Sequence, residues 1–277
     1  MSALYHEGEL RAQELAGEIS FGNGIRPFML EQHRDFFAAL PFVLLGTVEA
    51  DGRPRARVLG GAPGFIGSPD PTTLRIAVDS GGLRAGQAVG LLGLDFGTRR
   101  RNRANGVVRS VADGELVIDV RESFGNCPQH IVVRDVHAVA AVEAVVREFN
   151  GLDECAMISR AETFFIATSG GRYGVDISHR GGPAGFVRID GDTLTVPDYG
   201  GNRYFNTLGN VLIDPRAALL FIDDASGDML ELEGRVEIVW EDVAAAPGQP
   251  GGRHWRFKAE RGRITHGGLA LRWTRRQ

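Results

Sequence analysis

The chain has 277 residues, of which 43% are hydrophobic and 24% charged. These proportions belong to a folded protein and exclude disorder for the bulk of the chain. The formal net charge of −4 argues against nucleic acid and membrane surfaces as partners, because both favour basic proteins. The 38 glycines predict many tight turns and bulges.

The start of the chain and its two cysteines bear on where the protein works. Residues 1–17 are acidic and polar and lack the apolar stretch of a signal peptide. Cys127 and Cys155 are too few for a disulfide framework, and no cluster of cysteine and histidine predicts a metal site. We therefore expect a cytoplasmic protein without a membrane span or a metal.

Short strands dominate the pattern along the chain, and helical spacing is rarer. Helices are expected at Leu30–Leu40 and at Val136–Phe149, where apolar residues recur every three or four positions. The expected strands are Phe42–Val48, Arg55–Gly60, Thr73–Val78, Ala88–Asp95, Arg103–Val111, Glu115–Arg121, Phe164–Thr168, Gly174–Ser178, Thr193–Val196, Ala217–Asp223, Met229–Trp240 and a final region from Trp255 to Trp273.

The two sets of strands resemble each other in order and in sequence. Gly60–Ile66 (GGAPGFI) parallels Gly181–Val187 (GGPAGFV), and Thr73–Ile76 parallels Thr193–Val196. The offset between matching segments stays between 120 and 128. Chance similarity between small β domains is the alternative, but an ordered series of matches favours duplication of a six-stranded unit.

The duplication predicts two units, residues 1–150 with an N-terminal helical segment and residues 151–277. The offset grows by about eight residues between the third and fourth strands, so the second unit is longer there. The added residues fall within Pro197–Pro215, where the first unit has only the glycine-rich connection Asp79–Gln87. Loops that differ between copies are places where function differs.

That added segment offers a candidate phosphate site. Asn202 is a suitable N-cap, and Arg203–Leu208 reads as a short helix whose first N–H groups lack partners. Arg203 supplies a guanidinium that matches phosphate, and Asn206 and Thr207 add donors one turn on. A capped connecting helix with a solvated arginine is the alternative.

The end of the second strand in the second unit is unusually polar. Ser178, His179 and Arg180 stand where the first unit has Arg57, Val58 and Leu59. Polar side chains at a strand end can face a ligand, although a solvated strand end is the simpler interpretation. The turn at Gly185 and Phe186 would let the backbone approach a ligand closely, or would be a simple bulge.

Two further segments of the first unit carry candidate residues. Arg99–Arg103 is the densest basic run of an acidic chain, and it is either a solvated face or a site for an anionic ligand. Cys127, within Ser123–His130, is a packed or a reactive thiol. The sequence lacks the dinucleotide-binding, P-loop, serine-hydrolase and zinc-protease motifs.

These residues resemble the pyridoxamine 5'-phosphate oxidase-related proteins, the FMN-binding split-barrel group. The resemblance rests on SHRGG, GF and PDYGGNRYFNTLGN in the second unit. HEGE, RRRNRANG and FGNCPQHI in the first unit are similar to a flavin-nucleotide-binding subgroup. The matching segments run from about residue 6 to residue 240. A mainly β protein of tandem six-stranded Greek-key split barrels is implied.

The resemblance also implies FMN, rather than FAD, as the cofactor. The flavin phosphate would contact Asn202, Arg203, Asn206 and Thr207, and the ribityl chain and ring edge would contact Ser178, His179 and Arg180. Asp198, Gly185 and Phe186 are further cofactor-binding candidates. The substrate-binding residues of pyridoxamine phosphate oxidases have no match here, so oxidation of a B6 vitamer is not expected.

Family members are typically dimers with flavins between two barrels, and this chain carries both barrels. We therefore expect an internal pseudo-dimer with one flavin, to which the first unit contributes Arg101, Asn102, Arg103, Asn126 and Gln129. An FMN-dependent oxidoreductase follows, using NAD(P)H as a donor and a small molecule as a substrate, and a homodimer is a further possibility. The alternatives are a non-catalytic flavin-binding or redox-sensing protein, and a haem or deazaflavin protein.

Overall fold

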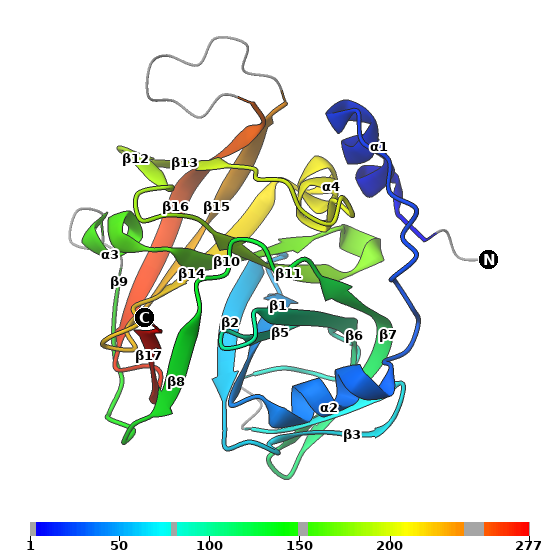
Figure 1. Cartoon of the computed structure of the whole chain (residues 1–277), viewed down its shortest axis with the longest axis vertical. Helices are drawn as coiled ribbons and strands as arrows, with labels where there is room; N and C mark the ends of the chain where they lie inside the picture. Colours follow the sequence, from blue (N-terminus) through cyan, green and yellow to red (C-terminus); the bar gives the residue numbers. More distant parts are fainter. Residues whose placement is uncertain (1–3, 79–81, 149–154, 241–251, 277) are drawn as a thin grey trace.

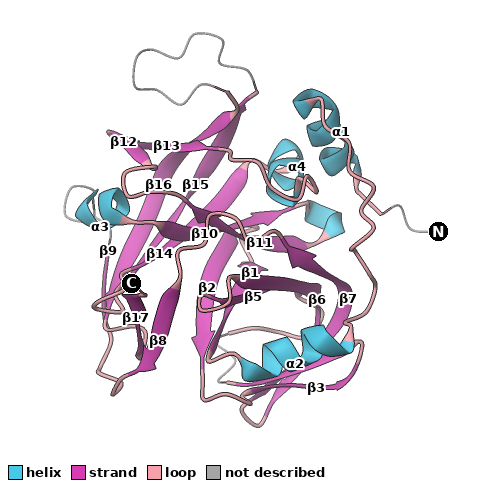
Figure 2. Cartoon of the chain, in the orientation of Figure 1, coloured by secondary structure: helices cyan, strands magenta, loops and turns pink. Residues whose placement is uncertain are grey.

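The structure, a computed structural model, describes residues 4–78, 82–148, 155–240 and 252–276. Strands form most of the regular structure, and short helices lie at the margins of the sheets (Figures 1 and 2). The helices in these ranges are α1 (Glu7–Ala16), α2 (Glu31–Ala39), α3 (Cys155–Arg160) and α4 (Asn206–Ile213), and a 3₁₀ turn lies at Gly171–Tyr173. Within these ranges, no helix has the length and apolar character needed to cross a membrane.

The first sheet contains seven antiparallel strands in the order β2-β1-β5-β6-β7-β4-β3. Its strands are β1 (Phe42–Val48), β2 (Pro54–Gly60), β3 (Ile66–Asp70), β4 (Thr73–Ala77), β5 (Ala88–Asp95), β6 (Arg100–Ala112) and β7 (Glu115–Asn126). Alternate apolar side chains, including Val43, Leu45, Leu91 and Ile118, point into a core inside this sheet, and α2 packs against the same core through Phe37.

The second sheet repeats that order strand for strand, as β11-β10-β14-β15-β16-β13-β12. Its strands are β10 (Thr163–Ser169), β11 (Val175–Gly181), β12 (Arg188–Asp190), β13 (Thr193–Pro197), β14 (Arg216–Ile222), β15 (Met229–Val239) and β16 (His254–His266). The mainly β tandem fold predicted from the sequence is therefore confirmed. Each sheet gains a short strand beyond the six expected, β3 in one and β12 in the other.

The repeated GG and GF pairs have the same structural role in both sheets. A Cβ atom on Gly61 would lie 2.5 Å from the ring of Phe65, and one on Gly182 would lie 2.6 Å from the ring of Phe186. Each glycine therefore makes room for an aromatic side chain that turns back onto it. This shared constraint explains why the motif recurs in the sequence.

The two sheets share a third core that lies between them. Along β1, Phe42 and Leu44 face this core, whereas the intervening Val43 faces the core of its own sheet. Phe165 and Leu220 approach from the second sheet. Strands β1, β5, β10 and β14 thus bury both faces, which makes the two sheets one continuous body.

The helix predicted at Val136–Phe149 is wrong. Residues there form β8 (Arg134–Ala138), which pairs with β17 (Leu271–Arg275), and β9 (Val145–Glu148), which pairs with β16. The valines of this segment are β-branched and suit an extended chain. Their strand partners lie more than a hundred residues away, so the local spacing could not reveal the pairing.

The predicted unit boundary near Asn150-Gly151 lies outside the described residues, and the division into residues 1–150 and 151–277 stays a prediction. Helix α1, from the first of those units, packs on α4 of the second (Figure 1). The two helices meet at glycines, because a Cβ atom on Gly8 would lie 2.2 Å from the carbonyl oxygen of Gly209.

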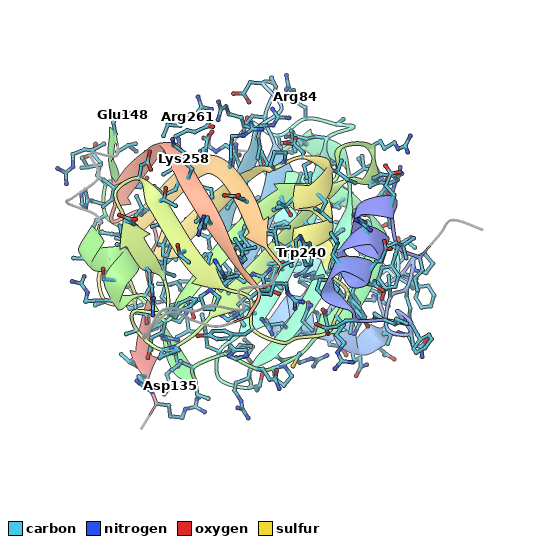
Figure 3. All side chains as sticks on the ribbon, turned by 90° about the horizontal axis from the view of Figure 1, so that it is seen from above. Arg84, Asp135, Glu148, Trp240, Lys258 and Arg261 are labelled. Atoms are coloured by element: carbon cyan, nitrogen blue, oxygen red, sulfur yellow. The ribbon has the colours of Figure 1, made fainter. Side chains whose placement is uncertain are left out.

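The outer faces of the sheets are polar. Strand β16 buries Trp255 and Phe257 and presents Lys258 and Arg261 to solvent (Figure 3). Arg261 pairs with Glu233 on the neighbouring strand, where the Nη2–Oε2 distance is 2.7 Å. Exposed pairs of this kind contribute little to stability, so the cores define the fold.

Candidate functional site

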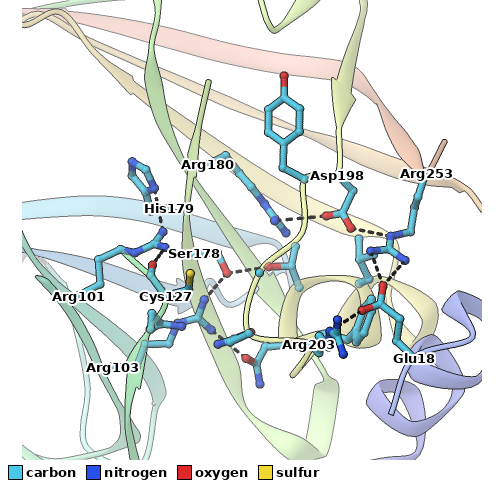
Figure 4. Close-up of a pocket in the computed structure, with 18 residues that line it drawn as sticks. Glu18, Arg101, Arg103, Cys127, Ser178, His179, Arg180, Asp198, Arg203 and Arg253 are labelled. Atoms are coloured by element: carbon cyan, nitrogen blue, oxygen red, sulfur yellow. Dashed lines mark hydrogen bonds and ion pairs between the residues drawn. The ribbon is translucent and has the colours of Figure 1, made fainter. Parts of the chain in front are cut away.

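An arginine-rich pocket lies where β6 and β7 of the first sheet meet β11 and α4 of the second (Figure 4). Its empty space, including the open mouth, is about 640 Å³. We call it the arginine pocket, and its lining consists of Glu18, Arg101, Arg103, Asn126, Cys127, Ser178, His179, Arg180, Asp198, Tyr199, Gly201, Asn202, Arg203, Phe205, Asn206, Thr207, Leu208 and Arg253.

The inner wall of the arginine pocket is built around the buried side chain of Arg103. This guanidinium forms an ion pair with Asp176 and donates to the Ser178 hydroxyl at 2.6 Å. The Ser178 hydroxyl lies 2.7 Å from the hydroxyl of Thr207, in the first turn of α4. A continuous polar network therefore joins the first sheet to α4 through β11.

His179 and Arg101 form the next layer of the wall. Arg101 Nη1 lies 2.9 Å from His179 Nδ1, and Arg101 also donates to the backbone oxygen of Cys127. Burial lowers the pKa of His179 well below its usual value, and the charge of Arg101 lowers it further. Burial and the neighbouring Arg103 lower the pKa of Arg101 to about 10. His179 is therefore neutral at pH 7, whereas Arg101 keeps its charge.

Helix α4 begins later than the sequence predicted. Asn202 is not its N-cap, because the Asn202 side chain instead accepts the backbone N–H of Tyr204 at 3.1 Å in a local turn. The residue before the helix is Phe205, whose φ of 61° is left-handed, as is that of Arg203. The cap offers no side-chain hydrogen bond, so the first N–H groups of the helix remain available at the pocket.

The outer part of the pocket is a chain of alternating charges. Asp198 accepts from Arg180 Nη1 at 3.3 Å and from Arg253 Nε at 2.6 Å. The two terminal nitrogens of Arg253 donate to Glu18 Oε1, and Arg203 Nε lies 3.0 Å from Glu18 Oε2. Arg253 also stacks over the ring of Phe205.

The structure brings most of the predicted site residues together in this pocket. From the first sheet come Arg101, Arg103 and Asn126, and the other predicted residues in the lining are Ser178, His179, Arg180, Asp198, Asn202, Arg203, Asn206 and Thr207.

Four predicted residues lie outside the lining of the pocket. Asn102 is buried and, by strand alternation, faces away from its neighbours Arg101 and Arg103. The side chain of Gln129 is exposed. Gly185 forms a turn with a φ of 84°, and the ring of Phe186 stacks on Phe164 in the core of the second sheet.

Sequence reasoning missed Glu18 and Arg253. Both stand next to glycine, outside any motif, and are brought to the pocket by long-range packing. Glu18 is placed by α1, which ends at Gly17 in a left-handed conformation with the Glu18 N–H bonded to the Gln13 carbonyl. Arg253 immediately precedes β16, at the end of that strand beside β13, and its carbonyl accepts the Asp198 N–H.

A counterpart of the arginine pocket exists on the other side of the shared core. The strand registers show which residues are equivalent. A row of cross-strand partners in the first sheet runs through Val58, Leu44, Leu92 and Arg103. The equivalent row in the second sheet runs, in the same order, through His179, Phe165, Leu220 and Glu231. This counterpart site is lined by Leu45, Arg55, Arg57, Val58, Leu59, Val78, Leu83, Leu220, Met229, Glu231 and Arg263.

The polarity of the central ion pair is reversed between the two sites. At the arginine pocket, Arg103 on β6 pairs with Asp176 on β11. At the counterpart site, Glu231 on β15 pairs with Arg55 on β2, with 2.9 Å between Oε2 and Nη2. In neither place, and nowhere else among the described residues, do three or more His, Cys, Asp or Glu side chains cluster as metal ligands would.

Comparison with known families places the chain. A family model described as pyridoxamine 5'-phosphate oxidase matches residues 29–148 and, a second time, residues 154–267. The chain belongs to the pyridoxamine 5'-phosphate oxidase family. The match covers both sheets and confirms the resemblance seen in the sequence. No curated protein matches the chain.

Several solved structures are similar to parts of this family member. An FAD-binding protein from Mesorhizobium loti shares 13% identity at a TM-score of 0.30, over 43% of this chain and 98% of its own. A putative pyridoxamine 5'-phosphate oxidase from Lactobacillus delbrueckii shares 19% identity at a TM-score of 0.29, over 36% of this chain and 95% of its own. HutZ, the heme storage protein from Vibrio cholerae, shares 11% identity at a TM-score of 0.29, over 42% of this chain and 94% of its own. The ligands in these names belong to those proteins.

Proposed function

We propose that the arginine pocket binds one FMN per chain and that the protein is a flavin-dependent oxidoreductase. The proposal is based on one observation: the start of α4, which has no side-chain cap, lies next to buried hydroxyl and guanidinium groups. The first turn of α4, Thr207, Ser178 and Arg103 form this arrangement. Backbone N–H groups and a guanidinium are the partners that a phosphate ester prefers.

The residues present fit a phosphorylated, hydroxyl-rich cofactor. Arg103 Nε, Arg180 Nε and Asn126 Oδ1 are buried and have no hydrogen-bond partner within the described ranges. An unsatisfied buried polar atom costs about 1–3 kcal/mol, so a ligand that pairs with these atoms gains that free energy. The phosphate and ribityl hydroxyls of FMN could provide such partners.

The chain's own residues would then have distinct roles. Thr207 and the neighbouring N–H groups of α4 hold the phosphate, and Ser178 positions Thr207 through their hydrogen bond. Arg101 and Arg180 give the ring end of the pocket a positive potential, which favours an anionic reduced form. With His179 Nδ1 accepting from Arg101, Nε2 carries the proton and faces Thr163 Oγ1 at 3.3 Å.

Bound FMN would supply hydride or electron transfer between a donor and a small-molecule substrate. NAD(P)H is the proposed donor, since it can deliver hydride at an open pocket mouth without a dedicated dinucleotide fold. A B6 vitamer is not proposed as a substrate. A homodimer in solution and a cytoplasmic location are further expectations.

Equilibrium titration with FMN and with riboflavin tests the proposal. We expect one FMN per chain and a Thr207→Val variant that binds FMN about tenfold more weakly, which corresponds to one lost hydrogen bond of about 1.4 kcal/mol. Riboflavin has no phosphate, so its affinity should not change in that variant. Met229→Ala, at the counterpart site, is the control and should leave both affinities unchanged.

Two results would contradict the proposal in different ways. A protein that binds neither flavin has no FMN site. Two FMN molecules per chain would mean that the counterpart site is also a flavin site. If FMN binds but NADH and NADPH do not reduce it faster than they reduce free FMN, the protein is a flavin binder that does not use these donors.

A further inference from the structure

The counterpart site is a cavity to which the proposed function assigns no role. Its empty space, including the open mouth, is about 850 Å³. Strands β1, β2, β14, β15 and β16 supply most of its walls, and Val78 and Leu83 contribute from the connection that follows β4. It shares no lining residue with the arginine pocket. A ligand bound here would therefore be a separate molecule from the proposed flavin.

Most of the lining of the counterpart site is apolar. Val58 and Leu59 on β2 and Met229 on β15 pack against the cores but are only partly buried. Leu83 and Leu220, which are buried, line the same cavity. An apolar ligand that covers the partly buried side chains removes their surface from water, and this is the main favourable contribution to apolar binding.

The charged part of the lining has an excess of positive charge. It contains Arg55, Arg57 and Arg263 and a single acid, Glu231, which pairs with Arg55 and Arg263. Glu49, outside the lining, pairs with Arg57. Three guanidinium groups thus stand against two carboxylates, and a ligand with one negative charge would balance the remaining positive charge.

The chemistry of this lining differs from that of a flavin site. Among its residues there is no hydroxyl or amide side chain and no helix start, whereas the arginine pocket offers Ser178, Thr207 and the first turn of α4. The ribityl hydroxyls of FMN would lie against leucine, valine and methionine side chains and lose their hydrogen bonds to water. The counterpart site therefore suits a less polar ligand.

We infer that the counterpart site binds a small organic molecule that combines an apolar body with a single carboxylate. The body would lie against Val58, Leu59 and Met229, and the carboxylate would contact Arg263, whose side chain is 38% exposed and so accessible to a ligand. A planar carboxylate matches the donor geometry of a guanidinium. The inference goes beyond the proposed function and does not depend on it.

Calorimetric titration of the full chain, free of flavin and at low ionic strength, tests the inference with octanoate as the probe. We expect one octanoate per chain. Acetate lacks the apolar body and octylammonium carries the opposite charge, so each should bind at least about tenfold more weakly. Equal affinity for octylammonium would contradict the preference for an anion, and equal affinity for acetate would contradict the apolar contact.

Two matched variants locate the binding. Arg263→Gln removes a partly exposed guanidinium from the counterpart site and should weaken octanoate binding about fivefold, the effect of losing one charge near the surface. Arg203→Gln removes an exposed guanidinium from the arginine pocket and should leave the affinity for octanoate unchanged. Met229→Trp places an indole ring in the cavity and should abolish binding. Thermal denaturation shows whether that variant folds, and if it does not, the arginine variants decide.

Three results would overturn the inference. The first is a native affinity for octanoate in Arg263→Gln, or in a folded Met229→Trp variant. The second is a loss in Arg203→Gln as large as that in Arg263→Gln, because the anion would then bind in the arginine pocket. The third is displacement of octanoate by excess FMN, which would place both molecules in one site. A chain that binds octanoate as expected but no FMN would contradict only the proposed function.

Discussion

The arginine pocket and its counterpart occupy equivalent positions in the two sheets and have opposite characters. The arginine pocket presents Ser178, His179 and Arg180 at the end of β11, where the counterpart site has Arg57, Val58 and Leu59 on β2. The difference continues across the strands, because Arg101 on β6 corresponds to Met229 on β15. One backbone arrangement therefore supports a polar site and a largely apolar one.

The two sites also differ in the connection from β13 to β14 and its equivalent in the first sheet, from β4 to β5. In the second sheet it contains α4, which brings uncapped N–H groups to the pocket. In the first sheet the connection is shorter, and Leu83 lines the counterpart site instead. The fold therefore provides two positions for a ligand, while the side chains and one inserted helix decide what each position can hold.

The largest expected effect concerns the central ion pairs. Arg103→Met leaves Asp176 buried without its charge partner and should lower the free energy of unfolding by about 3–5 kcal/mol. Glu231→Gln at the counterpart site should cost less, about 1–2 kcal/mol, because that pair is more exposed. Urea denaturation of both variants measures the difference.

A charge-exchanged variant sharpens this test. Because the counterpart site uses the opposite polarity at equivalent positions, Arg103→Glu combined with Asp176→Arg should recover much of the stability lost by Arg103→Met. Equal losses at the two sites would contradict the role assigned to burial. A double variant no more stable than Arg103→Met would show that the two environments differ more than their shared geometry suggests.

The next effect concerns α1, which packs beside the arginine pocket. Gly8→Ala places a methyl group against the backbone of Gly209 and should destabilise the docked helix by about 1–3 kcal/mol. Limited proteolysis should cut near residues 17–22 faster in this variant. Gly200→Ala, where a methyl group meets nothing within 4 Å, is the control and should be cut at the native rate.

The smallest effect is a pH dependence of the same docking. Burial raises the pKa of Glu9 to about 7, against a usual 4.5, although hydrogen bonds from the His6 N–H and the Asn206 amide oppose the rise. The folded protein thus favours the protonated acid, and this stabilisation is complete below pH 4.5 and is lost as the pH rises through 7.

Hydrogen exchange of the α1 amides measures this dependence. After correction for intrinsic rates, protection at pH 6 should exceed protection at pH 8 by roughly tenfold, and Glu9→Gln should remove the difference. Equal protection of the native protein at both values would contradict the assignment to Glu9.

Sequence patterns predicted the strands and the repeat because these depend on local alternation and on turn glycines such as Gly61 and Gly182. They also identified most of the predicted residues that line the arginine pocket, since these residues lie at strand ends and in the inserted segment. The helix prediction at Val136–Phe149 was wrong because the pairing of this segment with β16 and β17 is long-range. Glu18 and Arg253 were missed for the same reason.

The start of α4 shows a different limit. Asn202 is followed by a plausible helix, and local propensity alone would place the cap there. The chain instead makes an extra turn through the left-handed residues Arg203 and Phe205 before the helix begins. Phe205 then lies under Arg253, a contact from β16 that no local rule includes.

The shared core has a genetic consequence. In a symmetric pair of identical chains, one codon specifies both copies of every site, so a substitution that improves one alters the other. Here the two sheets are joined in a single gene product, and Arg103 and Glu231 are specified by separate codons. One sheet can therefore acquire a specialised site, while the other sheet serves to complete the core that the two sheets share.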